Sequence, residues 1–465
     1  MSGRESVQVE PGKAVTSQDA LLMNDEIVFP KDVANDSGRR APLSGAAQGD
    51  VTHGSVKTLP APGGIPGAAR RLIATAAISS TGDGFSIIAL SLLAVSTTRD
   101  PRLVALVFVA QRLPWVFGLW LARLVDACRR PARVLIAADL ARALVLVATV
   151  VVVVGRGASI GLLAAAGFAL GAGTLCHSAA QSTLLPHVAT GADLAKANGY
   201  LSSAEGLGYA AVGPAAGALV FAVGRTLPFL GDAVSFVVSA WLVWPLRHVT
   251  VPVSPRERTR AARVDEPRGH VVRAVLGHPV LSLLLAQMLV LGFAQSLVLS
   301  VMPLFVRGEL GVSAAWYGAF LGAAAVGGIM TGLVTPHLWA ERRNTLAFVT
   351  GAGAAAGLAY VAIADQRSAL AAVVFLFVFD GTVGITNTVV PTLRMEHAPP
   401  GARARTATLF RQAILGVQPI GAVLSGVLAR AYGVRASLTV AGVVIVVCFA
   451  LTTLPFRRAL ATVGA

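Results

Sequence analysis

Residues 134–155 read VLIAADLARALVLVATVVVVVG, in which Asp139 and Arg142 are the only charged side chains. A helix of about 20 apolar residues is long enough to cross a hydrocarbon layer of about 30 Å. Runs of this kind recur roughly every 30 residues from Arg71 to Pro455. Because every backbone polar group inside lipid needs a partner within its own segment, these runs predict transmembrane helices.

The predicted fold is an all-α polytopic membrane protein with twelve transmembrane helices. Only 13% of the 465 residues are charged and 55% are hydrophobic, which argues against a set of water-soluble domains. The predicted spans are residues 71–97, 102–122, 134–155, 158–184, 199–223, 227–246, 279–304, 314–335, 345–363, 368–391, 407–430 and 435–455.

Lysines and arginines lie mostly on alternate connections between these spans. With the N-terminus in the cytoplasm, the cytoplasmic connections carry 17 of them and the opposite connections carry 8. Basic residues are retained on the cytoplasmic side of a membrane, so we expect both termini there. The net charge of +15 is spread over separate short loops, which argues against a nucleic-acid-binding surface.

The chain is expected to have four regions. A repeat supports two of them, because the seven-residue spacing of Gly217 and Gly224 recurs at Gly426 and Gly433. Two pseudo-symmetric six-helix bundles are the layout of a transporter that rocks about a central cavity. The regions are a disordered cytoplasmic tail (1–66), a first bundle (67–246), a basic cytoplasmic linker (247–278) and a second bundle (279–465).

Six stretches in the first bundle, in chain order, are GDGFSIIALSLL (82–93), VLIAADLARAL (134–144), AAQSTLLPHV (179–188), DLAKANGYLSSAEGLG (193–208), GPAAG (213–217) and FLGDAVSFVVSA (229–240). Together with VVRAVLGHPVLSLLL (271–285) and GVLARAYGVRAS (426–437), they resemble the major facilitator superfamily. The resemblance is greatest to its drug:proton antiporter branch, which holds macrolide and enterobactin exporters. It implies a monomeric, cofactor-free transporter of a bacterial cytoplasmic membrane, with protons and a small molecule as its partners.

The loop between the second and third spans carries part of a superfamily motif, Gly-x-Leu-x-Asp-Arg-x-x-Arg. Asp126 stands at the Asp position, but Ala122 and Ala127 replace the glycine and the first arginine. Arg129 and Arg130 could supply the lost positive charge. The resemblance therefore implies a gating role for this loop.

The fifth span ends like the antiporter motif Gly-x-x-x-Gly-Pro-x-x-Gly-Gly. Gly213, Pro214 and Gly217 match it, whereas Tyr209 and Ala218 stand where the first and last glycines belong. Proton antiport is implied by this partial match.

Three carboxyls within the spans are candidates for proton coupling: Asp83, Asp380 and Glu205. An ionisable group at the centre of a bilayer costs about 2.5–3.5 kcal/mol on insertion scales, so each one needs a reason. A carboxyl there can load a proton on one side of the membrane and release it on the other. For Asp83, a purely structural pairing with the second span, for example with Arg112, is an equal alternative.

Polar side chains of other spans are candidates for the substrate cavity, or for joining helices. They are Arg112, Gln287, Gln295 and Asn387.

Asp139 and Arg142 are three residues apart and share a helix face, so they are expected to neutralise each other or to brace the cytoplasmic gate. Arg411 begins the eleventh span near the same gate. Asp126 is expected to meet the start of that span, where the helix dipole favours a carboxylate. His177 is expected to be a hydrogen-bonded packing residue, with proton transfer as the alternative.

The sequence favours a proton-coupled exporter of small amphipathic molecules, such as antibiotics or siderophores. An importer of a small nutrient, or a lipid flippase of the same fold, remains open because a fold fixes neither direction nor cargo. A membrane enzyme or a sensor is disfavoured, since the sequence has no HExxH, no GxSxG and no paired acidic metal motif.

Overall fold

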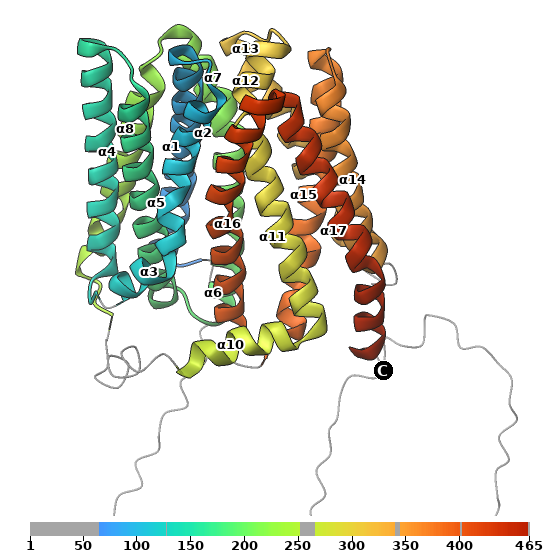
Figure 1. Ribbon diagram of the computed structural model, residues 1–465. Helices are drawn as coiled ribbons and strands as arrows, with labels where there is room; N and C mark the ends of the chain where they lie inside the picture. Colours follow the sequence, from blue (N-terminus) through green and yellow to red (C-terminus); the bar gives the residue numbers. More distant parts are fainter. Residues whose placement is uncertain (1–64, 127, 252–265, 340–344, 400–401, 464–465) are drawn as a thin grey trace, which may run out of the picture. The chain divides into compact units, whose positions relative to one another are not determined.

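The structure, a computed structural model, describes residues 65–126, 128–251, 266–339, 345–399 and 402–463, all of which belong to one compact unit, Pro62–Ala465. Almost all of the predicted tail lies outside these residues. Regular structure within them is helical (Figure 1). The α-helices are α1 (Gly67–Thr97), α2 (Pro101–Arg112), α3 (Gly118–Asp126), α4 (Pro131–Arg156), α5 (Ile160–Val188), α6 (Gly191–Leu207), α7 (Gly213–Val223), α8 (Leu227–Val243), α10 (Glu266–Gly277), α11 (Pro279–Leu299), α12 (Met302–Leu304), α13 (Ala314–Leu338), α14 (Thr345–Asp365), α15 (Ala369–His397), α16 (Arg403–Tyr432) and α17 (Val434–Val463).

Ten helices in the described part of the chain are long and apolar enough to cross a membrane. The predicted spans 102–122 and 199–223 are not among them, because each is interrupted. A 3₁₀ turn, Leu113–Phe117, separates α2 from α3, and a π turn, Gly208–Val212, separates α6 from α7. Each interruption lies at or just before a proline, whose ring disrupts regular α-helical hydrogen bonding. The prediction of twelve transmembrane helices is therefore not confirmed.

The helices pack in two groups, drawn in blue to green and in yellow to red in Figure 1. In the first group α1 packs on α7 and α8, and α4 packs on α5 and α8. In the second, α13 packs on α15, α14 on α17 and α11 on α16. The groups meet where α2 contacts α16 and where α7 contacts α13.

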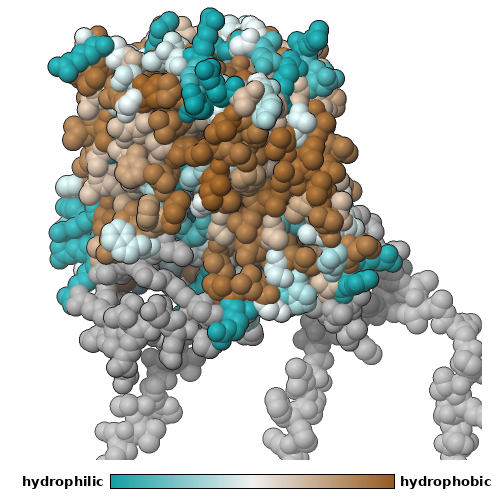
Figure 2. All heavy atoms as spheres, in the orientation of Figure 1, coloured by the Kyte–Doolittle hydropathy of each residue, from teal (hydrophilic) through white to brown (hydrophobic). Residues whose placement is uncertain are grey.

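The surface is hydrophobic over its middle and hydrophilic toward both ends of the helices (Figure 2). Many large apolar side chains are exposed, among them Leu144, Val154, Trp241 and Leu451, each at least 70% exposed. An apolar belt of this extent is stable against lipid and not against water. The chain is therefore a multi-pass membrane protein.

The start of α2 lies at a predicted connection between spans. Asp100 caps α2, because its side chain accepts a hydrogen bond of 2.9 Å from the Arg102 backbone N–H. Hydrogen bonds from the Arg102 side chain and backbone lower the pKa of the Asp100 carboxyl.

The predicted linker 247–278 includes α10, which lies across the ends of α11 and α16 (Figure 1). Residues 252–265 of the linker fall outside the described part.

Glycines allow the close approach of α7 and α13. A Cβ atom added at Gly318 would lie 2.4 Å from the Ala218 Cβ and 2.6 Å from the Pro214 carbonyl oxygen. Such distances are too short for any real Cβ contact, so the two helices would have to separate.

We therefore expect Gly318→Val to destabilise the protein by about 1–3 kcal/mol, the usual cost of overpacking a tight contact. Thermal denaturation of the purified protein in detergent measures the effect. The matched control is Gly332→Val on the same helix, where an added Cβ meets no atom within 4 Å. Equal denaturation temperatures for the two variants would contradict this view of the α7–α13 contact.

Candidate functional site

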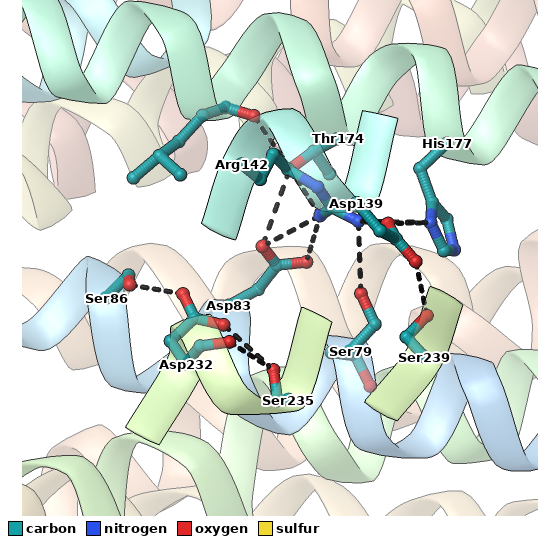
Figure 3. Close-up of polar contacts among 12 residues, drawn as sticks. Ser79, Asp83, Ser86, Asp139, Arg142, Thr174, His177, Asp232, Ser235 and Ser239 are labelled. Atoms are coloured by element: carbon teal, nitrogen blue, oxygen red, sulfur yellow. Dashed lines mark hydrogen bonds and ion pairs between the residues drawn. The ribbon is translucent and has the colours of Figure 1, made fainter. Parts of the chain in front are cut away.

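A buried ionic cluster joins α1, α4 and α5. Arg142, on α4, is only 1% exposed, and its guanidinium contacts two carboxylates. Its Nη1 atom lies 3.3 Å from Asp83 Oδ1, and its Nη2 donates to Asp139 Oδ1. Thr174, on α5, accepts a third hydrogen bond of 3.3 Å from Nη1. The cluster thus holds two carboxylates around one guanidinium (Figure 3).

A line of hydrogen bonds extends the cluster along α5 toward α6. His177 Nδ1 lies 2.7 Å from Asp139 Oδ1 and 3.0 Å from Arg142 Nη2. Its Nε2 lies 2.9 Å from Gln181 Oε1, and Gln181 Nε2 donates to Glu205 Oε1 at 3.0 Å. One continuous set of polar contacts therefore connects Asp83 to Glu205.

A further carboxyl, Asp232 on α8, is fully buried beside this cluster. Ser86, on α1, donates a hydrogen bond to its Oδ2, and the Ser235 hydroxyl donates to its Oδ1 at 3.0 Å (Figure 3). Ser239, one turn farther along α8, donates to Asp139. These serines tie α8 to α1 and α4.

Local sequence explains how the cluster is held. Asp139 and Arg142 are three residues apart on α4, and His177 and Gln181 are four apart on α5, so each pair shares a helix face. Gly173 leaves room for the arginine stem, since an added Cβ there would lie 2.4 Å from Arg142 Cγ. The Phe236 ring, 3.9 Å from the guanidinium carbon, covers the cation from the α8 side.

A cavity of about 360 Å³ borders the cluster, and we call it the cluster cavity. Asp83, His177, Gln181 and Glu205 all contribute to its wall. Several of its other lining residues carry a hydroxyl group, namely Ser79, Ser80, Thr174, Ser178, Ser202 and Tyr209.

A second cavity, of about 390 Å³, lies between the two groups of helices, and we call it the central cavity. Its walls are mainly apolar and aromatic side chains from both groups, such as Phe108, Leu321 and Phe379. Tyr209 and Gly206 line both cavities.

Asp380, on α15, is the carboxyl of the central cavity. Among the described residues, none forms a hydrogen bond or an ion pair with its side chain. The stacked rings of Tyr360 and Phe379, with centroids 4.0 Å apart, line the same wall. Arg112, on α2, also lines the cavity, and its Nη2 donates to the Tyr209 hydroxyl at 2.5 Å.

The geometry bears on the alternatives that the sequence left open for Asp83 and Gln287. Asp83 pairs with Arg142 and not with Arg112, which is directed to Tyr209 instead. Gln287 is fully buried and donates to Thr452 at 2.9 Å, so it joins α11 to α17 and lines neither cavity. Gln295 and Asn387 do line the central cavity, as expected of cavity residues, and Glu205 lines the cluster cavity.

The residues assigned to gating do not form one group in the described structure. Asp139 and Arg142 belong to the buried cluster, and their ion pair agrees with their spacing. Arg129 and Arg130 are exposed, and Arg411 lies 5.5 Å from the Trp115 ring. The side chain of Asp126 lies outside the described part, so its contact with the start of α16 stays a prediction.

The antiporter-motif glycines of α7 pack against α1. An added Cβ at Gly213 would lie 2.7 Å from Gly84 Cα, and one at Gly217 would lie 2.8 Å from Phe85 Cα. Pro214 follows the π turn and lines the central cavity. The motif therefore holds α1 and α7 together directly beside the cavity.

Sequence reasoning did not place Asp232 among the candidate functional residues or connect it with Ser86. The signal for a larger role was its position within the apolar span 227–246. Which residues of α1 and α8 face each other depends on helix rotation, which that signal does not contain.

Comparison with known proteins places this arrangement among membrane carriers. Residues 72–417 match the family model described as Major Facilitator Superfamily. No curated protein matches the chain.

Three solved structures with a similar fold have low sequence identity to this chain. A bacterial homologue of the human lysosomal transporter Spinster, in an inward-facing and unoccupied conformation, is 15% identical, with a TM-score of 0.66 over 86% of this chain and 99% of its own. A bacterial homologue of the iron transporter ferroportin is 15% identical, with a TM-score of 0.63 over 84% and 98%. The nucleoside transporter NupG is 13% identical, with a TM-score of 0.62 over 85% and 98%.

Proposed function

The chain belongs to the major facilitator superfamily, and on that premise we propose that it exports small amphipathic molecules in exchange for protons. In this proposal the protein is a monomer in a bacterial cytoplasmic membrane. The chain crosses the membrane twelve times, with α2–α3 and α6–α7 as the two interrupted crossings, and both termini are cytoplasmic. The two groups of helices would rock about the central cavity, as in other carriers built from two related halves.

The observation that carries this proposal is the Asp380 carboxyl in a mostly apolar cavity that both groups line. An acidic side chain without a protein partner in such a place can hold either a proton or a polar group of the cargo, but not both at once. That competition is the physical basis of antiport, because loading of one releases the other.

The chemistry of the central cavity supports an amphipathic cargo. Apolar and aromatic walls bind the lipophilic part of a molecule, and a few polar groups orient it. Asp380, Gln295 and Asn387 supply such groups from one half of the molecule, and Arg112 from the other. The cavity volume of about 390 Å³ is within the range of sites for drug-sized ligands.

Asp83 and Glu205 support proton coupling in the first half. Both line the cluster cavity, and Asp83 is paired with an arginine that a second carboxylate also contacts. Asp83 is a carboxyl that can release Arg142 when it becomes protonated, because Asp139 still neutralises the cation. The family alone does not set direction or cargo, since solved structures of similar fold are described as a nucleoside transporter, a peptide transporter and a bacterial homologue of an iron transporter.

A growth assay tests this proposal. Cells that carry the gene should tolerate higher concentrations of at least one amphipathic antimicrobial from a panel than cells without it. The difference should vanish when a protonophore collapses the proton gradient at sub-inhibitory concentration. Resistance that persists with the protonophore would contradict proton coupling. If cells that carry the gene are more sensitive to a compound than cells without it, the protein takes that compound up.

A further inference from the structure

The contacts of His177 cannot all be satisfied by a neutral ring and an ionised Glu205. Its Nδ1 lies 2.7 Å from Asp139 Oδ1, and its Nε2 lies 2.9 Å from Gln181 Oε1. Both partners are acceptors, and Asp139 Oδ1 is nearer to Nδ1 than the donor Arg142 Nη2, which lies 3.0 Å away. The two shorter contacts are therefore met when both ring nitrogens carry a proton. Gln181 then points its NH₂ group at Glu205 Oε1, 3.0 Å away, which accepts as a carboxylate. In this first arrangement the exchangeable proton is on His177.

A second arrangement satisfies the same contacts with the proton on Glu205. When the Gln181 carboxamide turns by half a rotation, its NH₂ group donates to Nε2 of a neutral His177. Its oxygen then accepts from a protonated Glu205. A carboxamide has nearly the same shape in both orientations, so the heavy atoms need not move. When His177 is neutral and Glu205 is ionised, one of these contacts always sets two acceptors against each other.

The cluster cavity offers the route for the proton. His177 and Glu205 both line it, and most of the lining residues carry hydroxyl, carboxyl or amide groups. A volume of about 360 Å³ is large enough for several water molecules, and Asp83, Gln181 and Glu205 are among the residues with which they can form hydrogen bonds. Ser202 and Gly206, at its edge on α6, are exposed.

Charged side chains from four helices surround His177. Asp139 and Arg142 face it from α4, and Asp83 reaches the same arginine from α1. Asp232, on α8, interacts electrostatically with Asp83 and Arg142. Glu205 faces it from α6 through Gln181.

Two further groups complete these surroundings. Cys176 precedes His177 on α5. On α2, Arg112 is directed to Tyr209. Apart from His177, the ionisable groups in direct contact along this line are three carboxyls and one guanidinium.

We infer that His177, Gln181 and Glu205 hold one exchangeable proton between them and pass it between the cluster cavity and the Asp83–Arg142–Asp139 cluster. The proton leaves Glu205 Oε1, crosses cavity water and binds His177 Nε2, while the Gln181 amide turns to match. No bond other than O–H and N–H forms or breaks. The relay rests on the proposed proton-driven transport, because it supplies that transport with a proton entry.

Histidine-selective ¹⁵N magnetic resonance of the full-length protein in lipid bilayers tests the relay, with the His177 signal identified by its loss in His177→Gln. The readout is the pH at which the ring becomes doubly protonated. Glu205→Leu frees the Gln181 amide to turn, so His177 should bind its proton about tenfold more weakly, a midpoint shift of about one pH unit. Gln181→Leu should weaken it similarly, and adding Glu205→Leu should then change little.

The double variant separates the relay from simple charge attraction. If Glu205 acted on His177 only through space, Glu205→Leu would have its full effect even without Gln181, and that result would overturn the inference. An unchanged midpoint in all variants would also overturn it. The readout needs no cargo, so it does not depend on the growth assay. If the protein moved cargo without a proton, the effect of Glu205 on His177 could still be measured. Asn198→Leu, at an exposed position of α6, is the matched control.

Discussion

Arg142→Met is expected to destabilise the folded protein by about 3–5 kcal/mol, the cost of leaving a buried ion without its partner. The guanidinium is 1% exposed and contacts Asp83 and Asp139 together, so its removal leaves two carboxylates in the interior of the helix bundle. Methionine fills a similar volume, so the loss is mainly of charge. Thermal denaturation in detergent should show a fall on the order of 5 °C or more.

Two comparisons make this prediction specific. Arg156→Met changes an exposed arginine near the end of the same helix and should leave the denaturation temperature almost unchanged. The triple variant Arg142→Met, Asp83→Asn, Asp139→Asn should recover most of the loss, because no unpaired charge remains. If the triple variant is no more stable than Arg142→Met, the ionic cluster does not explain the effect.

Asp380→Asn is expected to abolish proton-driven accumulation of cargo while cargo exchange at equal pH continues. An amide has a similar shape and polarity but cannot take up and release a proton. For a neutral cargo exchanged for one proton, a gradient of one pH unit supplies about 1.4 kcal/mol, or tenfold accumulation. Proteoliposomes with the variant should therefore accumulate about tenfold less cargo, at a final ratio near one.

Asp365→Asn is the matched control, because that carboxyl is exposed at the end of α14 and outside the cavities. It should accumulate cargo as the unchanged protein does. If Asp380→Asn accumulates cargo fully, this carboxyl is not needed for proton coupling. Its remaining role would be contact with the cargo. Loss of exchange as well would indicate a role in binding or folding instead.

Sequence reasoning predicted those features that depend on neighbours along one helix. Apolar runs such as 134–155 became continuous helices, and the three-residue spacing of Asp139 and Arg142 produced an ion pair. The rotation of one helix against another is not contained in such patterns. The sequence left a pairing of Asp83 with Arg112 open as one alternative, and the structure pairs Asp83 with Arg142 instead.

The helix interruptions were missed for a related reason. Average hydropathy does not distinguish a continuous helix from one that changes to a 3₁₀ or π turn, although Pro114 and Pro214 were visible. The connection from His177 through Gln181 to Glu205 was also beyond the sequence, because it needs α5 and α6 at a fixed distance. Polar residues within the spans correctly indicated that their side chains pair with one another. They did not indicate which pairs form.

The most direct test of proton antiport follows protons while cargo moves. Proteoliposomes would be loaded with the compound found in the growth assay, together with a pH-sensitive dye, and then diluted into medium without the compound and without a pH gradient. As cargo leaves, protons should enter, and the lumen should become acidic only when the protein is present. An unchanged internal pH would indicate simple facilitated diffusion, and an alkaline shift would indicate cotransport, and either result would contradict the exchange proposed here.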